Sequence, residues 1–225
     1  MSVSRLSPST QNYVKAIWNL QEWSNEPVTA SALANKVGVR LSSASDAIRK
    51  LASQELVQHT PYGEVSLTEQ GRQAALQMVR RHRLIECFLV EMLGYRWDQV
   101  HDEAEHLEHA VSDFMIARID EKLGHPTRDP HGDPIPSEDG TISHPDAIRL
   151  SDVDPESKVR VERIADDDPT LLQYFGDNGL KVGSIVSTRP GAPYSDATEV
   201  LLEGHEGPLL LGQSATDAVF VTLLK

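Results

Sequence analysis

The stretch from His82 to His109 constrains the fold most, because its imidazole and carboxylate groups recur at helical spacing. Positions four apart lie on one face of a helix, so His82 and Glu86 share a face. Four further residues at i, i+4, i+7 and i+8 share a face of a second helix: His101, Glu105, Glu108 and His109. Nitrogen and oxygen donors converging from two helices, without a thiolate, predict a site for a divalent transition metal.

A plainer interpretation stays open at this point, since a charge-rich helix is usually a solvated face. The position of His82 favours the metal. Ala75 and Met78 begin an apolar stripe that passes through His82 and continues to Ile85. His82 is therefore expected to point inward, where an unpaired polar group is costly. A metal shared with the second helix would satisfy it.

The net charge of −13 is unevenly distributed. Residues 1–83 hold ten Lys/Arg and six Asp/Glu, a net of +4, whereas residues 84–225 hold eleven and twenty-eight, a net of −17. A mildly basic N-terminal third suits contact with phosphates. The single cysteine, Cys87, fits a reducing cytoplasm. There is no bilayer-length apolar run and no signal-peptide pattern. We therefore expect a cytoplasmic protein without a membrane partner.

The N-terminal part predicts a helix-turn-helix. Apolar periodicity indicates helices over 9–23, from Thr29 to Val37 and from Ser42 onward, with Gly38 in the connecting turn. Hydroxyls at the start of the third helix suit base edges and phosphates, and basic residues at its end suit phosphates. With a flanking arginine and a tyrosine further on, the residues expected to contact DNA are Arg40, Ser42, Ser43, Asp46, Arg49, Lys50 and Tyr62.

Two alternating runs, 56–60 and 64–68, predict a hairpin with Tyr62 at its tip, which is a wing beside the recognition helix. Thr68 is expected to cap a long helix to about Met92. A second long helix is expected from Asp98 to about Leu123. Its additional apolar side makes the pair a candidate dimer interface.

The last hundred residues change character. Proline and glycine over 124–155 predict an irregular linker. Short strands and one helical patch follow, which predicts a small β-barrel. The expected strands are 158–164, 184–188, 198–202, 209–211 and 219–224, with the helical patch at 169–175. The fold class is thus mostly α with a small β part. The expected domains are 1–75 (winged helix-turn-helix), 76–145 (helical dimerisation and metal binding, with the linker from 124) and 156–225 (β-barrel).

Three phrases in this order resemble a known family. They are His-Arg-Leu-Ile-Glu at 82–86, His-Asp-Glu-Ala-Glu-His-Leu-Glu-His at 101–109, and Asp-Pro-His-Gly-Asp-Pro-Ile-Pro at 129–136. Between a winged helix-turn-helix and a small β domain, they resemble the diphtheria toxin repressor and iron-dependent regulator family, in particular its manganese-responsive branch. The resemblance covers essentially the whole chain.

The resemblance implies a homodimer that represses transcription on double-stranded operator DNA when Mn(II), or else Fe(II), is bound. It implies an SH3-like C-terminal barrel on which the proline-rich phrase can dock. One metal site would comprise His82, Glu86, His101 and Asp168, and the other Asn12, Glu105, Glu108 and His109. Glu105 stands where iron-responsive members have cysteine, which hardens that site. No catalytic residue and no small-molecule substrate are implied.

Two other classes of function remain open from the residues alone. Paired Glu and His residues on helices also build two-metal carboxylate enzymes. Against this, no nucleophile motif is readable and the helix-turn-helix would have no role. Alternatively, the His/Glu clusters are structural and the regulator responds to an organic effector. Calorimetry with Mn(II), with and without operator DNA, separates the three hypotheses.

Overall fold

The computed structural model describes residues 3–60, 63–192, 194–205 and 207–224, and the chain divides into two compact units. The first unit combines residues 1–85, 105–124 and 136–142. The second combines residues 86–104, 125–135 and 143–225. The helical region expected as one middle domain therefore contributes to both units.

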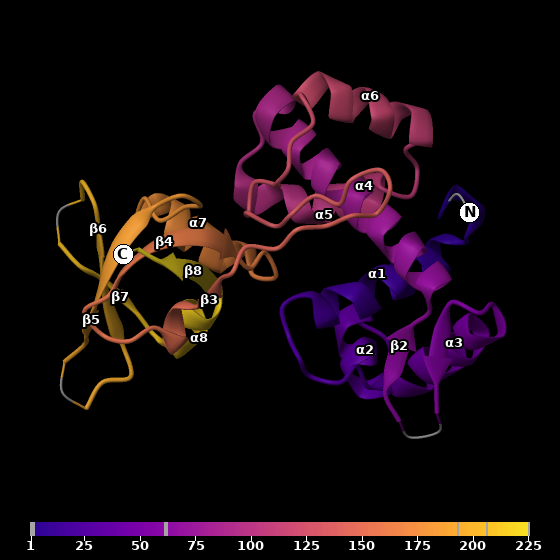
Figure 1. Cartoon of the computed structure of the whole chain (residues 1–225), viewed down its shortest axis with the longest axis horizontal. Coiled ribbons are helices and arrows are strands. Elements are labelled where there is room, and N and C mark those ends of the chain that lie inside the picture. The colour runs from indigo at the N-terminus through magenta and orange to yellow at the C-terminus, as the bar shows by residue number, and fades with distance from the viewer. Residues whose placement is uncertain (1–2, 61–62, 193, 206, 225) are drawn as a thin grey trace. The chain divides into compact units, whose positions relative to one another are not determined.

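Figure 1 labels the helices and strands in chain order. They are η1 (Val3–Arg5), α1 (Pro8–Glu22), α2 (Ala30–Val37), α3 (Leu41–Ser53), β1 (Val57–His59), β2 (Val65–Leu67), α4 (Glu69–Leu93), η2 (Trp97–Gln99), α5 (Val100–Leu107), α6 (Asp113–Leu123), β3 (Ile148–Arg149), η3 (Leu150–Asp152), β4 (Lys158–Ile164), α7 (Pro169–Asp177), β5 (Ile185–Pro190), β6 (Thr198–Leu202), β7 (Leu209–Leu211), α8 (Gln213–Asp217) and β8 (Val219–Leu223). Among the described residues, no helix is both long and apolar enough to cross a membrane.

The first unit begins with a helix-turn-helix. The Thr29 side chain accepts a hydrogen bond from the Ala32 amide and so caps α2 at its start. Gly38 ends α2 in the left-handed conformation, with φ of 70°, which glycine adopts without steric cost. The three-residue connection to α3 is therefore tight. The apolar faces of these helices meet in one core that includes Ile17, Leu33 and Ile48.

The predicted wing and the long helix after it are confirmed in the described residues. β1 and β2 pair antiparallel, with Val57 opposite Leu67. The Thr68 hydroxyl accepts a hydrogen bond from the Gly71 amide at 3.0 Å, which caps α4 as expected. The first half of α4 joins the winged-helix core through Met78.

The single helix expected from Asp98 to Leu123 is wrong, because two helices, α5 and α6, occupy this stretch. A turn separates them, and the Ser112 side chain caps α6 by accepting from the Met115 amide at 3.2 Å. A serine that caps a new helix start competes with continuation of the preceding helix. Glu108 and His109 consequently lie in the turn after α5.

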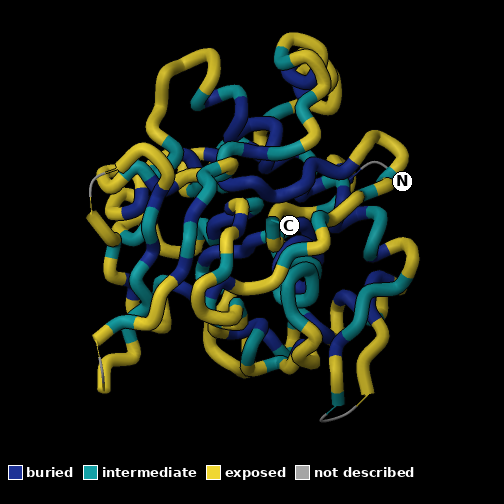
Figure 2. The backbone as a smooth tube through the Cα atoms, turned by 60° about the vertical axis from the view of Figure 1, so that its left-hand side comes forward, coloured by how far each residue is buried: buried dark blue, intermediate teal, exposed yellow. Residues whose placement is uncertain are grey.

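The second unit contains a six-stranded antiparallel sheet in the order β3-β8-β4-β5-β6-β7, drawn from orange to yellow in Figure 1. It is the expected small SH3-like β domain, and the predicted strands and helical patch are all present within a few residues. Alternate side chains of β4, such as Val159 and Val161, are buried. They pack with Phe175 of α7 in the core of this unit. Figure 2 shows which stretches of the backbone are buried and which are exposed.

The proline-rich phrase, expected from its composition to be an irregular linker, packs on β4 of the domain on which the resemblance implies that it can dock. All but one of its residues, 129–136, are buried. The His131 carbonyl accepts a hydrogen bond from the Ile164 amide of β4 at 2.9 Å. Asp133 pairs with Arg163 at 2.7 Å. Backbone rich in proline and glycine can thus be ordered when its polar groups find partners in the neighbouring sheet.

Gly132 marks the closest approach of this phrase to β4. Its φ is +92°, and a Cβ at this position would lie 2.1 Å from the Glu162 carbonyl oxygen. Gly183 has a similar φ of +85° but no atom within 4 Å of its Cβ position. We predict that Gly183→Ala lowers the unfolding free energy by about 1 kcal/mol, and that Gly132→Ala lowers it clearly more, because backbone must move. Urea denaturation measures both. Equal losses would contradict the close packing of the phrase on β4.

Candidate functional site

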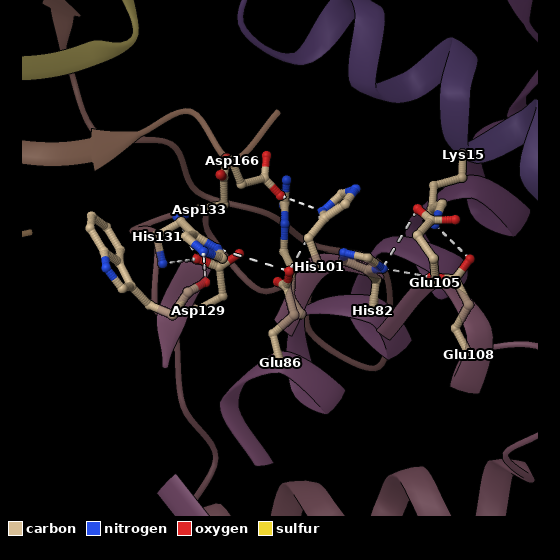
Figure 3. A network of polar contacts seen from close by, with 12 residues as sticks. Lys15, His82, Glu86, His101, Glu105, Glu108, Asp129, His131, Asp133 and Asp166 are labelled. Atoms are coloured by element: carbon tan, nitrogen blue, oxygen red, sulfur yellow. Dashed lines mark hydrogen bonds and ion pairs between the residues drawn. The ribbon is translucent and has the colours of Figure 1, made fainter. Parts of the chain in front are cut away.

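His101 of α5 lies between two carboxylates in the second unit. Its Nδ1 atom is 2.8 Å from Asp166 Oδ2 and 3.8 Å from Glu86 Oε1. Glu86 comes from α4 and is 1% exposed, and Asp166 follows the end of β4. Figure 3 shows the three side chains directed toward one another. Two acidic groups around one imidazole make a place that favours positive charge.

His131 adds a buried nitrogen for which the described part of the chain offers no hydrogen-bond partner. Its Nε2 lies 2.8 Å from the Trp97 carbonyl, so in the neutral ring Nε2–H donates there and Nδ1 keeps a free lone pair. Nδ1 has no hydrogen-bond partner among the described residues and lies 3.9 Å from Glu86 Oε1. The His131 side chain is 0% exposed. A buried acceptor without a donor is rare and indicates a missing cation or water.

Asp129 completes this group. One ligand atom from each of Glu86, Asp129 and His131 lies within 4.8 Å of the others. The backbone amides of His131 and Asp133 both donate to Asp129 Oδ1 at 2.9 Å, which fixes the direction of the carboxylate. Five residues of the second unit make up this group, the first centre: Glu86, His101, Asp129, His131 and Asp166.

The pKa values of the first centre show how strongly it attracts positive charge. Burial alone lowers the pKa of His101, but the hydrogen bonds that its ring donates to the Asp166 and Glu86 carboxylates outweigh burial and raise the pKa to about 11. For His131, burial is likewise outweighed by the charges of Glu86 and Asp129, which raise its pKa. Burial raises the pKa of Asp166, but the hydrogen bond and charge of His101 dominate and hold it well below the usual value. These residues fit a divalent cation, which would replace the proton of His101.

A second cluster lies in the first unit and already holds a cationic side chain. Lys15 Nζ of α1 is 2.5 Å from Glu105 Oε1 and 2.6 Å from Glu108 Oε1. His82 Nδ1 is 2.7 Å from Glu108 Oε2. His109 Nδ1 is 2.6 Å from Gln11 Oε1 of α1. The Lys15 ammonium thus takes the position between two carboxylates that a metal would need (Figure 3).

One site residue expected from sequence, Asp168, has another role in the structure. Asp168 caps α7, where its Oδ1 accepts from the Thr170 and Leu171 amides. Asp166, two residues earlier, is the carboxylate bonded to His101. On α1, Gln11 and Lys15 contact the second cluster. Asn12 stays a predicted ligand, and its side-chain oxygen is buried without a hydrogen-bond partner among the described residues.

The expected pair His82 and Glu86 lies on successive turns of α4, and both residues are buried. His82 makes its short contact with Glu108 of the second cluster. Glu105, Glu108 and His109 are gathered in one place as expected, although only Glu105 lies on α5. His101 lies one turn before Glu105 on α5, so the helix carries one residue of each group.

Sequence reasoning missed Asp129, His131, Asp166 and Lys15. The phrase at 129–136 was singled out, but its proline content indicated a linker instead of a ligand-bearing loop. Nothing in the run Asp166-Asp167-Asp168 distinguishes the inward carboxylate from the helix cap. For Lys15 there was a weak signal, since Gln11 and Lys15 are four apart and therefore share a face of α1.

The expected DNA-contacting residues of α3 form an exposed face. Ser42, Ser43, Asp46, Arg49 and Lys50 are exposed, as is Arg40 just before the helix. Arg49 forms an ion pair with Asp46 one turn earlier, so Asp46 has a partner when DNA is absent. Tyr62 lies outside the described residues.

Three family descriptions match the chain in succession. The N-terminal DNA-binding domain of iron-dependent repressors matches residues 5–65. Their metal-binding and dimerisation domain matches residues 68–137, and the FeoA domain matches residues 148–223. A winged helix-turn-helix, a cation-attracting centre and an SH3-like domain in one chain define a metal-dependent transcriptional regulator. The chain belongs to the iron-dependent repressor family.

Relatives and solved structures agree with this assignment. The iron-dependent repressor IdeR of Mycobacterium tuberculosis is 28% identical over 222 residues, covering 92% of this chain and 94% of the relative. The diphtheria toxin repressor of Corynebacterium efficiens is 33% identical over 131 residues, covering 58% of this chain and 56% of the relative. A manganese-dependent transcriptional repressor in complex with manganese is 49% identical, with a TM-score of 0.91 over 96% of this chain and 100% of that one.

The raised pKa of His101 predicts that the apparent affinity for Mn(II) depends on pH. Because its folded pKa is about 11, His101 holds a proton throughout the range from pH 6 to 8, and metal binding must release it. We predict that the apparent affinity for Mn(II) rises by about tenfold per pH unit in this range, as one released proton requires. Calorimetry in buffers of different ionisation enthalpy measures the proton directly. Affinity independent of pH, with no proton released, would contradict the assignment of His101.

Proposed function

We propose that this chain is a manganese-responsive repressor whose effector ion binds at the first centre. The observation that carries the proposal is the buried Nδ1 of His131, which has no hydrogen-bond partner among the described residues and faces the Glu86 carboxylate. The surrounding donors are three carboxylates and two imidazoles. A bound ion would supply the positive charge that this group needs and would hold its donors in one arrangement.

The choice of Mn(II) over other ions is argued from the donors. Carboxylate oxygens are hard ligands and imidazole nitrogens are borderline ligands, and both suit Mn(II) and Fe(II). The first centre contains no thiolate, the ligand that favours softer ions. The one cysteine, Cys87, is buried with its pKa raised by burial, so it stays a neutral thiol. Support for manganese also comes from the similar structure described as a manganese-dependent repressor in complex with manganese.

The residues of the first centre come from four segments that the ion would fix together. Glu86 belongs to α4 and His101 to α5, while Asp129 and His131 belong to the buried phrase and Asp166 to the β domain. Fixing His101 also fixes α5. One turn later on α5, Glu105 bonds Lys15 of α1. We infer that α5 transmits the state of the first centre to the helices that precede the recognition helix.

The DNA-binding step follows from the exposed face of α3. As the second helix of a helix-turn-helix, α3 would enter the major groove of operator DNA, with Ser42 and Ser43 near the bases and Arg49 and Lys50 near phosphates. A homodimer would present two such helices to successive half-sites, and it would act in the cytoplasm on metal-homeostasis genes. Metal would bias the dimer toward this arrangement, and operator DNA would tighten metal binding in return.

Two neighbouring aspartates provide a matched test. Asp166→Asn removes the charge that pairs with His101, whereas Asp168→Asn keeps the cap of α7, since asparagine caps as well as aspartate. We predict that Asp166→Asn weakens Mn(II) affinity by about 100-fold and abolishes manganese-dependent binding of operator DNA in an electrophoretic shift assay. Asp168→Asn should stay within about threefold of the wild type. Retention of manganese-dependent DNA binding by Asp166→Asn would remove the proposal's support.

The recognition face has its own test. Arg49→Ala is expected to weaken binding of the manganese-loaded protein to all DNA sequences and to reduce the slope of log affinity against log salt by about one, because one phosphate contact is lost. Fluorescence anisotropy over a series of salt concentrations measures the slope. Arg118→Ala on α6, also exposed and paired to a carboxylate one turn away, serves as the control. An unchanged slope for Arg49→Ala would place the phosphate contacts elsewhere.

A further inference from the structure

The second cluster differs from the first centre in one decisive respect, which is that a basic residue of the chain lies inside it. The Lys15 side chain is 6% exposed and Glu108 is fully buried. The distances of 2.5 and 2.6 Å from Nζ to the two carboxylates are those of short charge-assisted hydrogen bonds. The Lys15 ammonium therefore occupies the position between the two carboxylates and compensates one of their two negative charges.

The remaining donors of the second cluster are engaged as well. His109 Nδ1 is bonded to Gln11 Oε1 at 2.6 Å, and the Gln11 amide nitrogen donates to the Val3 carbonyl at 2.9 Å. Glu108 Oε2 lies 2.7 Å from His82 Nδ1. Each expected ligand in the turn after α5 thus has a protein partner at hydrogen-bond distance.

A second basic residue donates hydrogen bonds to backbone carbonyls of the same turn. Arg81 of α4 is 4% exposed, and its Nη1 donates to the Glu108 carbonyl at 3.3 Å and the Val111 carbonyl at 2.9 Å. The Arg81 guanidinium is itself paired with the Asp113 carboxylate, so Lys15 is the cation that matters here.

A divalent ion placed between Glu105 and Glu108 would face the ammonium of Lys15. Like charges at such distances repel strongly inside a protein. The donor set is right for a metal, but its position is taken.

We propose that Lys15 is the resident cation of the second cluster, so that this chain binds one regulatory metal ion per protomer, at the first centre alone. The cluster acts as a metal-independent latch that ties α1 to α5 and to the turn after it. This inference rests on the proposed function, because it assigns the effector ion to the other centre. Lys15 is a positioning residue, since it holds the helices and does not contact the effector ion.

The test is a count of Mn(II) in the purified full-length protein after removal of metal by chelator and dialysis against a small excess of Mn(II). Elemental analysis gives the stoichiometry, and calorimetry gives the affinity. We expect one ion per protomer in the wild type. Asp166→Asn should lose it, and Glu108→Gln should keep it with affinity within about threefold of the wild type, since removal of a latch carboxylate leaves the first-centre ligands in place.

Lys15→Met supplies the complementary arm, with Lys122→Met as its control because Lys122 is exposed on α6 of the same unit. Without the ammonium, the carboxylates of Glu105 and Glu108 are uncompensated. We expect Lys15→Met to unfold at lower temperature than the wild type without metal, to bind a second Mn(II), and to recover stability when Mn(II) is added. Lys122→Met should bind one ion, as the wild type does.

The outcomes separate the inference from the proposed function. Two Mn(II) ions of similar affinity in the wild type, one of them lost in Glu108→Gln, would overturn the inference and leave the repressor function standing. One ion that is lost in Glu108→Gln but kept in Asp166→Asn would overturn it too. No Mn(II) in the wild type would overturn the proposed function and the inference together. The wild-type count and the two conservative carboxylate variants decide the matter even where Lys15→Met does not fold.

Discussion

Compensation of buried negative charge is the constraint on which the rest of the structure depends. Glu86, Asp129 and Asp133 are each less than a tenth exposed, and a carboxylate removed from water is costly unless a cation or several donors replace the solvent. The positive charge that compensates the buried carboxylate comes from a different type of side chain at each of these sites. Asp133 has Arg163, Glu108 has Lys15 together with His82, and Glu86 has two histidines. We propose that the last arrangement is the one that exchanges its positive charge for a metal ion.

The type of cation beside each carboxylate decides whether the contact is permanent or can respond to a metal ion. A lysine or arginine keeps its proton over the physiological range, so the pairs that contain one hold under all metal conditions. Imidazole can give up its proton to a metal, and the first centre holds two of them beside three carboxylates. The latch and the first centre are carried on successive turns of α5, through Glu105 and His101. In our proposal, α5 therefore connects the Lys15–Glu105 contact, which does not depend on metal, to the first centre, which does.

Sequence periodicity predicted the elements and the residue types well, but not every partner. The i, i+4 spacing placed His82 with Glu86 and His101 with Glu105 on shared helix faces, because helical geometry is local. Asp166 could not be told from Asp168, since the choice depends on where β4 ends and α7 begins. His131 and Asp129 could not be predicted as ligands, because they lie in a proline-rich phrase. The burial of this phrase depends on a hydrogen bond to β4, a strand that is distant from it in sequence. Lys15 reaches residues ninety positions away, a contact that no local pattern reports.

The most direct measurement is anomalous scattering at the manganese edge from crystals of the manganese-loaded protein. The account predicts one strong peak per protomer, within bonding distance of Glu86, His131 and Asp166, with the Lys15 ammonium still between Glu105 and Glu108. A peak between Glu105 and Glu108 with Lys15 displaced, and no density at the first centre, would contradict it.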